Sequence, residues 1–154
     1  MKLLLVTVGK VRTPYLKEGC DDYARRIRKL APLEVMEVKP VKGSEPDNAI
    51  NKEGAGIINA LDAAGFKTVV LHDRGKTLTS KEFAKLLGDV ESSGAHGVAF
   101  VIGGAWGLRG DVVEKAQYGI SLGKMTMSHE LARLVLLEQI YRAQTTLRGI
   151  PYPK

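Results

Sequence analysis

The sequence has one cysteine, one tryptophan, three histidines and no long hydrophobic run. The single cysteine, Cys20, excludes a disulfide within the chain, which fits a reducing compartment. No apolar stretch approaches the roughly 20 residues that cross a membrane. The apolar run at the start of the chain stops at Gly9, too early for a secretory signal. We therefore expect a cytoplasmic protein.

Several catalytic signatures are also missing. The histidines, His72, His96 and His129, lack metal-ligand spacing and no cysteine cluster accompanies them, so we expect no metal site. No Gly-x-Ser-x-Gly segment indicates a serine nucleophile. Nothing near Cys20 would activate its thiol, and we interpret it as a buried apolar residue. His129 is interpreted as support for the start of the last helix rather than as a chemical group.

The 154 residues are 44% hydrophobic and 26% charged, which predicts one globular domain over residues 1–154. The formal net charge of +6 suits a polyanionic partner, but lysines that only aid solubility explain it equally well. The basic residues gather in two groups: Arg25, Arg26, Arg28 and Lys29, then Arg133, Arg142, Arg148 and Lys154. Arg142 is the best functional candidate among them, because it lies within an apolar stretch where a charge needs a partner.

Short apolar runs alternate with amphipathic stretches along the chain. The runs predict strands at 3–8, 33–38, 68–72, 97–102 and 119–122. The stretches predict helices at 14–30, at 47–64 after an Asp47 cap, at 79–94 after a Thr79–Glu82 capping box, at 111–117, and at 128–148. A turn is expected at 74–76. The alternation predicts an α/β fold, a parallel-type sheet flanked by helices.

Ligands of such sheets bind beyond the carboxyl ends of the strands. The loops after Leu71, Ile102 and Leu122 are therefore the first candidates. Gly103–Gly107 has the spacing of neither a dinucleotide loop nor a Walker A loop, and a plain tight turn remains as good an interpretation as a binding loop. The loop over 121–128 contains glycine and apolar residues that could line an adenine pocket.

The last predicted helix is apolar on more than one side. Its apolar positions include Leu131, Leu134, Leu137 and Ile140, and together they exceed the stripe that one core contact requires. We prefer the interpretation that a second copy of the chain covers part of this helix. A helix at the centre of a single chain is the alternative.

Several segments together resemble the ribosomal RNA large subunit methyltransferase H family of the SPOUT superfamily. They are residues 1–10, 71–76, 100–104, 122–129 and 138–143, and they span the chain in the family's order. The resemblance implies a SPOUT fold with a C-terminal trefoil knot, and a homodimer. It implies N3-methylation of a pseudouridine in large-subunit (23S) ribosomal RNA of assembled ribosomes, without a metal. S-adenosyl-L-methionine would be the methyl donor, contacted by Leu71, Gly103, Leu122, Gly123, Lys124, Met125, Thr126 and Met127.

The resemblance also implies catalytic roles for Tyr152, Lys154 and Arg142. Family members end in Tyr-His-Arg or Tyr-His-Lys, whereas Pro153 stands here in place of the histidine. Two rival functions stay open, and Pro153 motivates the first of them. The chain could bind cofactor or RNA with weak or lost turnover, or it could be a general α/β binding module without methyl chemistry.

Overall fold

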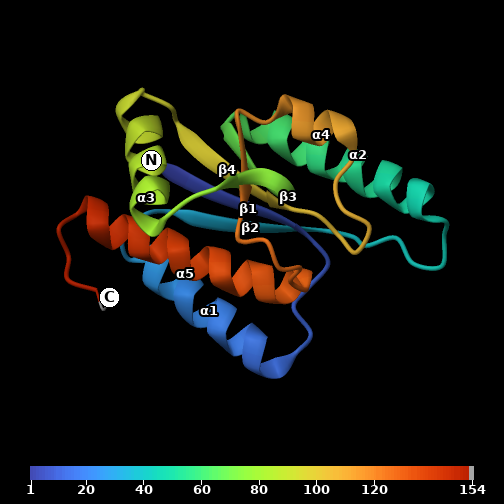
Figure 1. Cartoon of the computed structure of the whole chain (residues 1–154), viewed down its shortest axis with the longest axis horizontal. Coiled ribbons are helices and arrows are strands. Elements are labelled where there is room, and N and C mark those ends of the chain that lie inside the picture. The colour runs from blue at the N-terminus through green and yellow to red at the C-terminus, as the bar shows by residue number, and fades with distance from the viewer. Residues whose placement is uncertain (153–154) are drawn as a thin grey trace.

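The computed structural model describes residues 1–152, which form a five-stranded parallel sheet between two layers of helices (Figure 1). The strands are β1 (Lys2–Val8), β2 (Leu33–Val38), β3 (Lys67–Thr77), β4 (Gly97–Ile102) and β5 (Tyr118–Ser121), in the spatial order β2-β1-β4-β3-β5. The helices are α1 (Pro14–Arg28), α2 (Pro46–Ala64), α3 (Ser80–Ser92), α4 (Gly110–Lys115) and α5 (His129–Leu147). The predicted α/β class is confirmed. None of the helices within residues 1–152 combines the length and the apolar character that crossing a bilayer requires.

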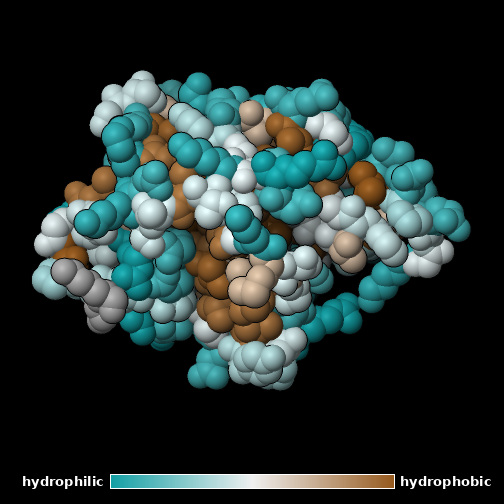
Figure 2. All heavy atoms as spheres, in the orientation of Figure 1, coloured by the Kyte–Doolittle hydropathy of each residue, from teal (hydrophilic) through white to brown (hydrophobic). Residues whose placement is uncertain are grey.

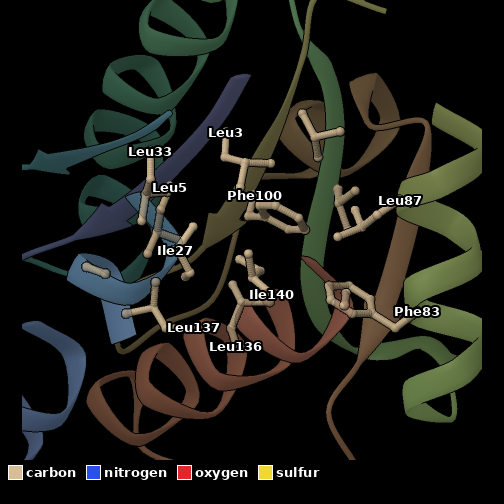
Figure 3. Close-up of a cluster of buried hydrophobic side chains, with 14 of the residues drawn as sticks. Leu3, Leu5, Ile27, Leu33, Phe83, Leu87, Phe100, Leu136, Leu137 and Ile140 are labelled. Atoms are coloured by element: carbon tan, nitrogen blue, oxygen red, sulfur yellow. The ribbon is translucent and has the colours of Figure 1, made fainter. Parts of the chain in front are cut away.

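Helices α1, α3 and α5 cover one face of the sheet, and α2 and α4 cover the other (Figure 1). Because both faces are covered, every residue of β4 is buried. The larger core lies on the side of α5 and includes Phe100 of β4 together with Leu137 and Ile140 of α5 (Figure 3). The smaller core joins Val101 of β4 to Ile57 of α2.

The third strand differs from its prediction. The expected turn at 74–76 is wrong, because β3 continues to Thr77 through a bulge in which Leu71 and Lys76 both pair with Ile120 of β5. Gly75 lies against this strand so closely that a Cβ would be 2.3 Å from the Ile120 carbonyl carbon. Arg-Gly-Lys has the composition of a turn, and only the contact with β5 reveals that it is a bulge.

Helix α1 begins at Pro14 as predicted, two further helix starts follow the sequence, and one does not. The Thr79–Glu82 capping box is present, and the Ser128 side chain accepts the Leu131 N–H. Asp47 is not the cap of α2, because the helix begins at Pro46, whose ring suits the first helical position. The remaining boundaries match the prediction or shift by one or two residues, as helix and strand ends commonly do.

Candidate functional site

Pairing between the strands brings the three predicted cofactor segments together. Leu71 of β3 pairs with Ile102 of β4 on one side and with Ile120 of β5 on the other. Neighbouring strands lie about 4.8 Å apart, so the chain leaves β4 and β5 close to Leu71. We call Leu71, Gly103–Gly107 and Leu122–Met127 the loop cluster. Its segments share the carboxyl edge of the sheet, where parallel α/β folds bind their ligands.

The turn after β4 is narrow and has little side-chain bulk. The Gly107 N–H donates to the Gly104 carbonyl at 3.1 Å, and Gly107 has a φ of +88°, which favours glycine. A Cβ on Gly103 would lie 2.8 Å from the Gly107 oxygen. Trp106 projects from the turn with 57% of its surface exposed. The turn can therefore bring its backbone close to a ligand and place an indole beside it.

The segment before α5 offers unpaired backbone groups. The Ser121 hydroxyl donates to the Gly123 carbonyl at 2.8 Å and accepts the Gly123 N–H at 3.3 Å, which fixes the start of the segment. Within residues 1–152, the backbone N–H and C=O groups of 124–127 make no hydrogen bond. Such groups can pair with the edge of a purine. The residues present thus fit the adenine of a nucleoside cofactor.

A second group of residues lies between α1 and α5 and holds the end of the described chain. Tyr23, Tyr141, Tyr152 and Arg142 form it, and we call them the tyrosine cluster. The rings of Tyr141 and Tyr152 meet edge to face at 4.9 Å, and the Arg142 guanidinium lies 4.7 Å from the Tyr152 ring centre. Arg142 also donates to the carboxylate of Glu138 at 2.6 Å. Arg142 therefore has the partner that its apolar surroundings require.

The phenol of Tyr152 is a poor proton acceptor in this setting. Burial raises the pKa of Tyr152 well above its ordinary value of 10.0, and its contact with the Tyr23 hydroxyl raises the pKa further. The phenol is therefore protonated at neutral pH. It can donate or accept a neutral hydrogen bond, but it does not supply a phenolate base.

The loop cluster and the tyrosine cluster are well separated within one chain. Tyr141 lies twelve residues beyond His129, which is about 18 Å along the helix axis, whereas the loop cluster leads directly into the first turn of α5. The structure therefore joins Tyr152 to Arg142 but does not bring either of them to the loop cluster. The third predicted catalytic residue, Lys154, lies outside the described residues.

The basic groups predicted to meet a polyanion are partly neutralised by nearby acids. Arg25 and Arg26 both pair with Asp22 on α1. Arg133 donates to Glu37 at 2.9 Å and to the Thr7 hydroxyl at 3.3 Å. The charge available to RNA is therefore smaller than the sequence count suggests.

Sequence reasoning missed two residues: Glu53, whose carboxylate lies against Gly104 of the loop cluster, and Tyr23 of the tyrosine cluster. Glu53 lies on the buried side of α2, and its spacing from Ala49 and Ile57 could have placed it there. Tyr23 joins the tyrosine cluster from α1. No local pattern in the sequence connects it to Tyr152.

The chain is similar to known methyltransferases along its length. A family described as predicted SPOUT methyltransferases matches residues 1–153. The ribosomal RNA large subunit methyltransferase H of Carboxydothermus hydrogenoformans is 39% identical, with 100% of both chains covered.

Two solved structures share the fold. A probable methyltransferase from Bordetella pertussis Tohama I has a TM-score of 0.60 at 15% identity, over 93% of this chain and 96% of its own. A Legionella pneumophila methyltransferase with bound S-adenosylmethionine has a TM-score of 0.50 at 13% identity, over 93% of this chain and 66% of its own.

Proposed function

The chain belongs to the SPOUT methyltransferase family, and we propose that it transfers a methyl group from S-adenosylmethionine to large-subunit ribosomal RNA. The observation that carries the proposal is the loop cluster. Three segments from different parts of the sequence meet at the carboxyl edge of the sheet, and one of them presents free backbone groups that suit adenine. The full-length relative named as a ribosomal RNA large subunit methyltransferase supports the choice of RNA as the acceptor.

We further propose N3 of a pseudouridine as the acceptor atom, following the family resemblance. When bound, S-adenosylmethionine supplies an electrophilic methyl group, so the main task of the protein is alignment. Holding N3 about 3–3.5 Å from the methyl carbon can account for much of the rate acceleration. Arg142 and Tyr152 would orient the uracil ring or an adjacent phosphate. Because the Tyr152 phenol is protonated, the N3 proton would pass to water or to His129.

The proposed working unit is a homodimer, because one chain does not bring its two groups of site residues together. The loop cluster of one protomer and the tyrosine cluster of its partner would then form one site. The surface of α5 supports this arrangement: Leu131 has 39% of its surface exposed, and Leu134 and Val135 are only partly covered. Figure 2 shows hydrophobic surface gathered over α5 and α1. The C-terminal trefoil knot and the cytoplasmic location remain parts of the same proposal.

The first test is methyl transfer to its substrate. Ribosomes from a strain that lacks the modification should accept labelled methyl groups, and mass-spectrometric mapping should locate them on one nucleotide of the large-subunit RNA. Binding of S-adenosylmethionine without transfer would favour the rival in which Pro153 has abolished turnover. The variant Pro153→His should then raise activity.

A second test separates both of these functions from a general binding module. A ligand that binds only the native state must raise the melting temperature. We expect saturating S-adenosylhomocysteine to raise it, and the absence of any rise would contradict the proposed function.

A further inference from the structure

Glu53 is a buried carboxylate with one unused oxygen. Only 5% of the surface of Glu53 is exposed. Its Oε1 accepts the Val41 N–H at 3.0 Å, whereas its Oε2 is buried and has no hydrogen-bond partner in residues 1–152. Leaving a charged oxygen buried without a donor is costly. An unpaired group of this kind calls for an explanation in function.

The unused oxygen lies against the turn that follows β4. A Cβ built on Gly104 would be 2.7 Å from Glu53 Oε2 and 3.2 Å from the Val8 side chain, so only glycine lets the turn approach the carboxylate this closely. Val8 ends β1, and Gly104 follows β4. The contact therefore lies at the carboxyl ends of the neighbouring strands β1 and β4, within the loop cluster.

A second unpaired atom lies at the same edge. Within residues 1–152, the only buried side-chain nitrogen or oxygen without a partner, besides Glu53 Oε2, is the Nε of Arg133, whose guanidinium donates to Thr7 near the end of β1. Arg133 lies on the α5 side of the sheet and Glu53 on the α2 side, so the two unpaired atoms lie near the end of β1 on opposite faces.

We propose that Glu53 is a positioning residue for the turn, and that its free oxygen accepts a backbone N–H of the turn when S-adenosylmethionine binds. The N–H groups of Ala105 and Trp106 make no hydrogen bond within residues 1–152, so the two residues that follow Gly104 offer free donors. Binding would exchange an unpaired buried charge for a paired one. This inference rests on the proposed function and adds a residue that acts through the turn rather than by contact with the ligand.

The variant Glu53→Gln tests the inference. The amide has nearly the same shape and its oxygen can still accept the Val41 N–H, but its NH₂ group cannot accept an N–H from the turn. We expect the ligand-free variant to melt at the same temperature as wild type or higher, because an unpaired buried charge is removed. We expect its Kd for S-adenosylhomocysteine to rise about tenfold, the loss of one hydrogen bond to a charged group.

Hydrogen exchange distinguishes a ligand-dependent role of Glu53 from a purely structural one, because a structural role would not change how the ligand slows exchange. S-adenosylhomocysteine should slow exchange of the Ala105 and Trp106 amides in wild type, and should slow it less in Glu53→Gln. The matched control is Asp62→Asn, which removes one negative charge from the exposed side of the same helix, where Asp62 pairs with Lys115. The control should leave both the Kd and the exchange unchanged.

A second variant tests the contact from the other side. Gly104→Ala should also weaken S-adenosylhomocysteine binding, and its effect should not add to that of Glu53→Gln, because both changes act on one contact. Equal affinity of wild type and Glu53→Gln would overturn the role of Glu53, and so would a ligand-free variant that melts well below wild type. A wild-type protein that fails to bind S-adenosylhomocysteine would instead overturn the proposed function together with this inference.

Discussion

The hydroxyl oxygens of Tyr23 and Tyr152 lie 3.1 Å apart, and this contact joins α1 to the segment that follows α5. It fixes the direction in which the end of the chain leaves the helix. The contact therefore holds Tyr152, the last described residue, against α1.

Removal of the Tyr23 hydroxyl should loosen this segment without affecting the loop cluster. We expect Tyr23→Phe to weaken the attachment of the segment after α5 to α1 by about 1 kcal/mol. Methyl transfer should become several-fold slower, whereas the Kd for S-adenosylhomocysteine should not change. The matched control is Tyr15→Phe on the same helix, because Tyr15 is 73% exposed. A change in Kd equal to the loss of rate would contradict the assignment.

The raised pKa of Tyr152 makes stability depend on alkaline pH. Below about pH 10 the phenol is protonated in both the folded and the unfolded chain, so it contributes no pH dependence. Above that pH the unfolded chain releases the proton while the folded chain retains it, so stability falls as the pH rises. Melting curves should therefore show a shallower alkaline decline for Tyr152→Phe than for wild type. Parallel declines would contradict the burial of the phenol.

Gly75 controls the position of β5 and of the segment that follows it. A side chain on Gly75 would meet the Ile120 backbone at 2.3 Å, so Gly75→Ala must displace β5 from β3. We expect a loss of thermal stability and a weaker Kd for S-adenosylhomocysteine. Gly110→Ala is the control, because a Cβ on Gly110 would meet nothing within 4 Å. Unchanged binding in Gly75→Ala would show that the cofactor does not depend on the position of β5.

A charge on the exposed part of α5 should separate the protomers. Leu131→Glu places a carboxylate three residues after the Ser128 cap, where it completes a capping box, so the helix itself should remain stable. Analytical ultracentrifugation should find a dimer for wild type and a monomer for the variant, and the monomer should have lost methyl transfer. A monomeric variant with full activity would contradict the two-chain site.

The sequence predicted those features that depend on local chemistry. The sequence predicts strand β4 at its observed bounds because five consecutive apolar residues follow Gly97 and end at Gly103. The sequence also predicts the Thr79–Glu82 capping box, because each of its contacts spans only three residues. The convergence of the loops after Ile102 and Leu122 follows from the rule that parallel strands end at one edge. Leu71 lies beside them because it pairs with Ile102, although β3 continues to Thr77.

Features that depend on contacts distant in the sequence could not be predicted. The bulge at Gly75 exists because β5 passes beside it, although the sequence there has the composition of a turn. Tyr23 and Tyr152 are separated by 129 positions, and no periodicity connects them. The unpaired oxygen of Glu53 is likewise visible only once α2 has been placed against the Gly104 turn.

The most direct test of the account is complementation between two defective chains. Gly103→Val should block the loop cluster, since even a Cβ there lies 2.8 Å from the Gly107 oxygen, and Tyr152→Ala should remove the tyrosine cluster. Each homodimer should be inactive. Heterodimers purified with two different tags should recover about half of wild-type methyl transfer, because one of their two sites combines an intact loop cluster with an intact partner tyrosine. Heterodimers as inactive as both parents would contradict a site built from two chains.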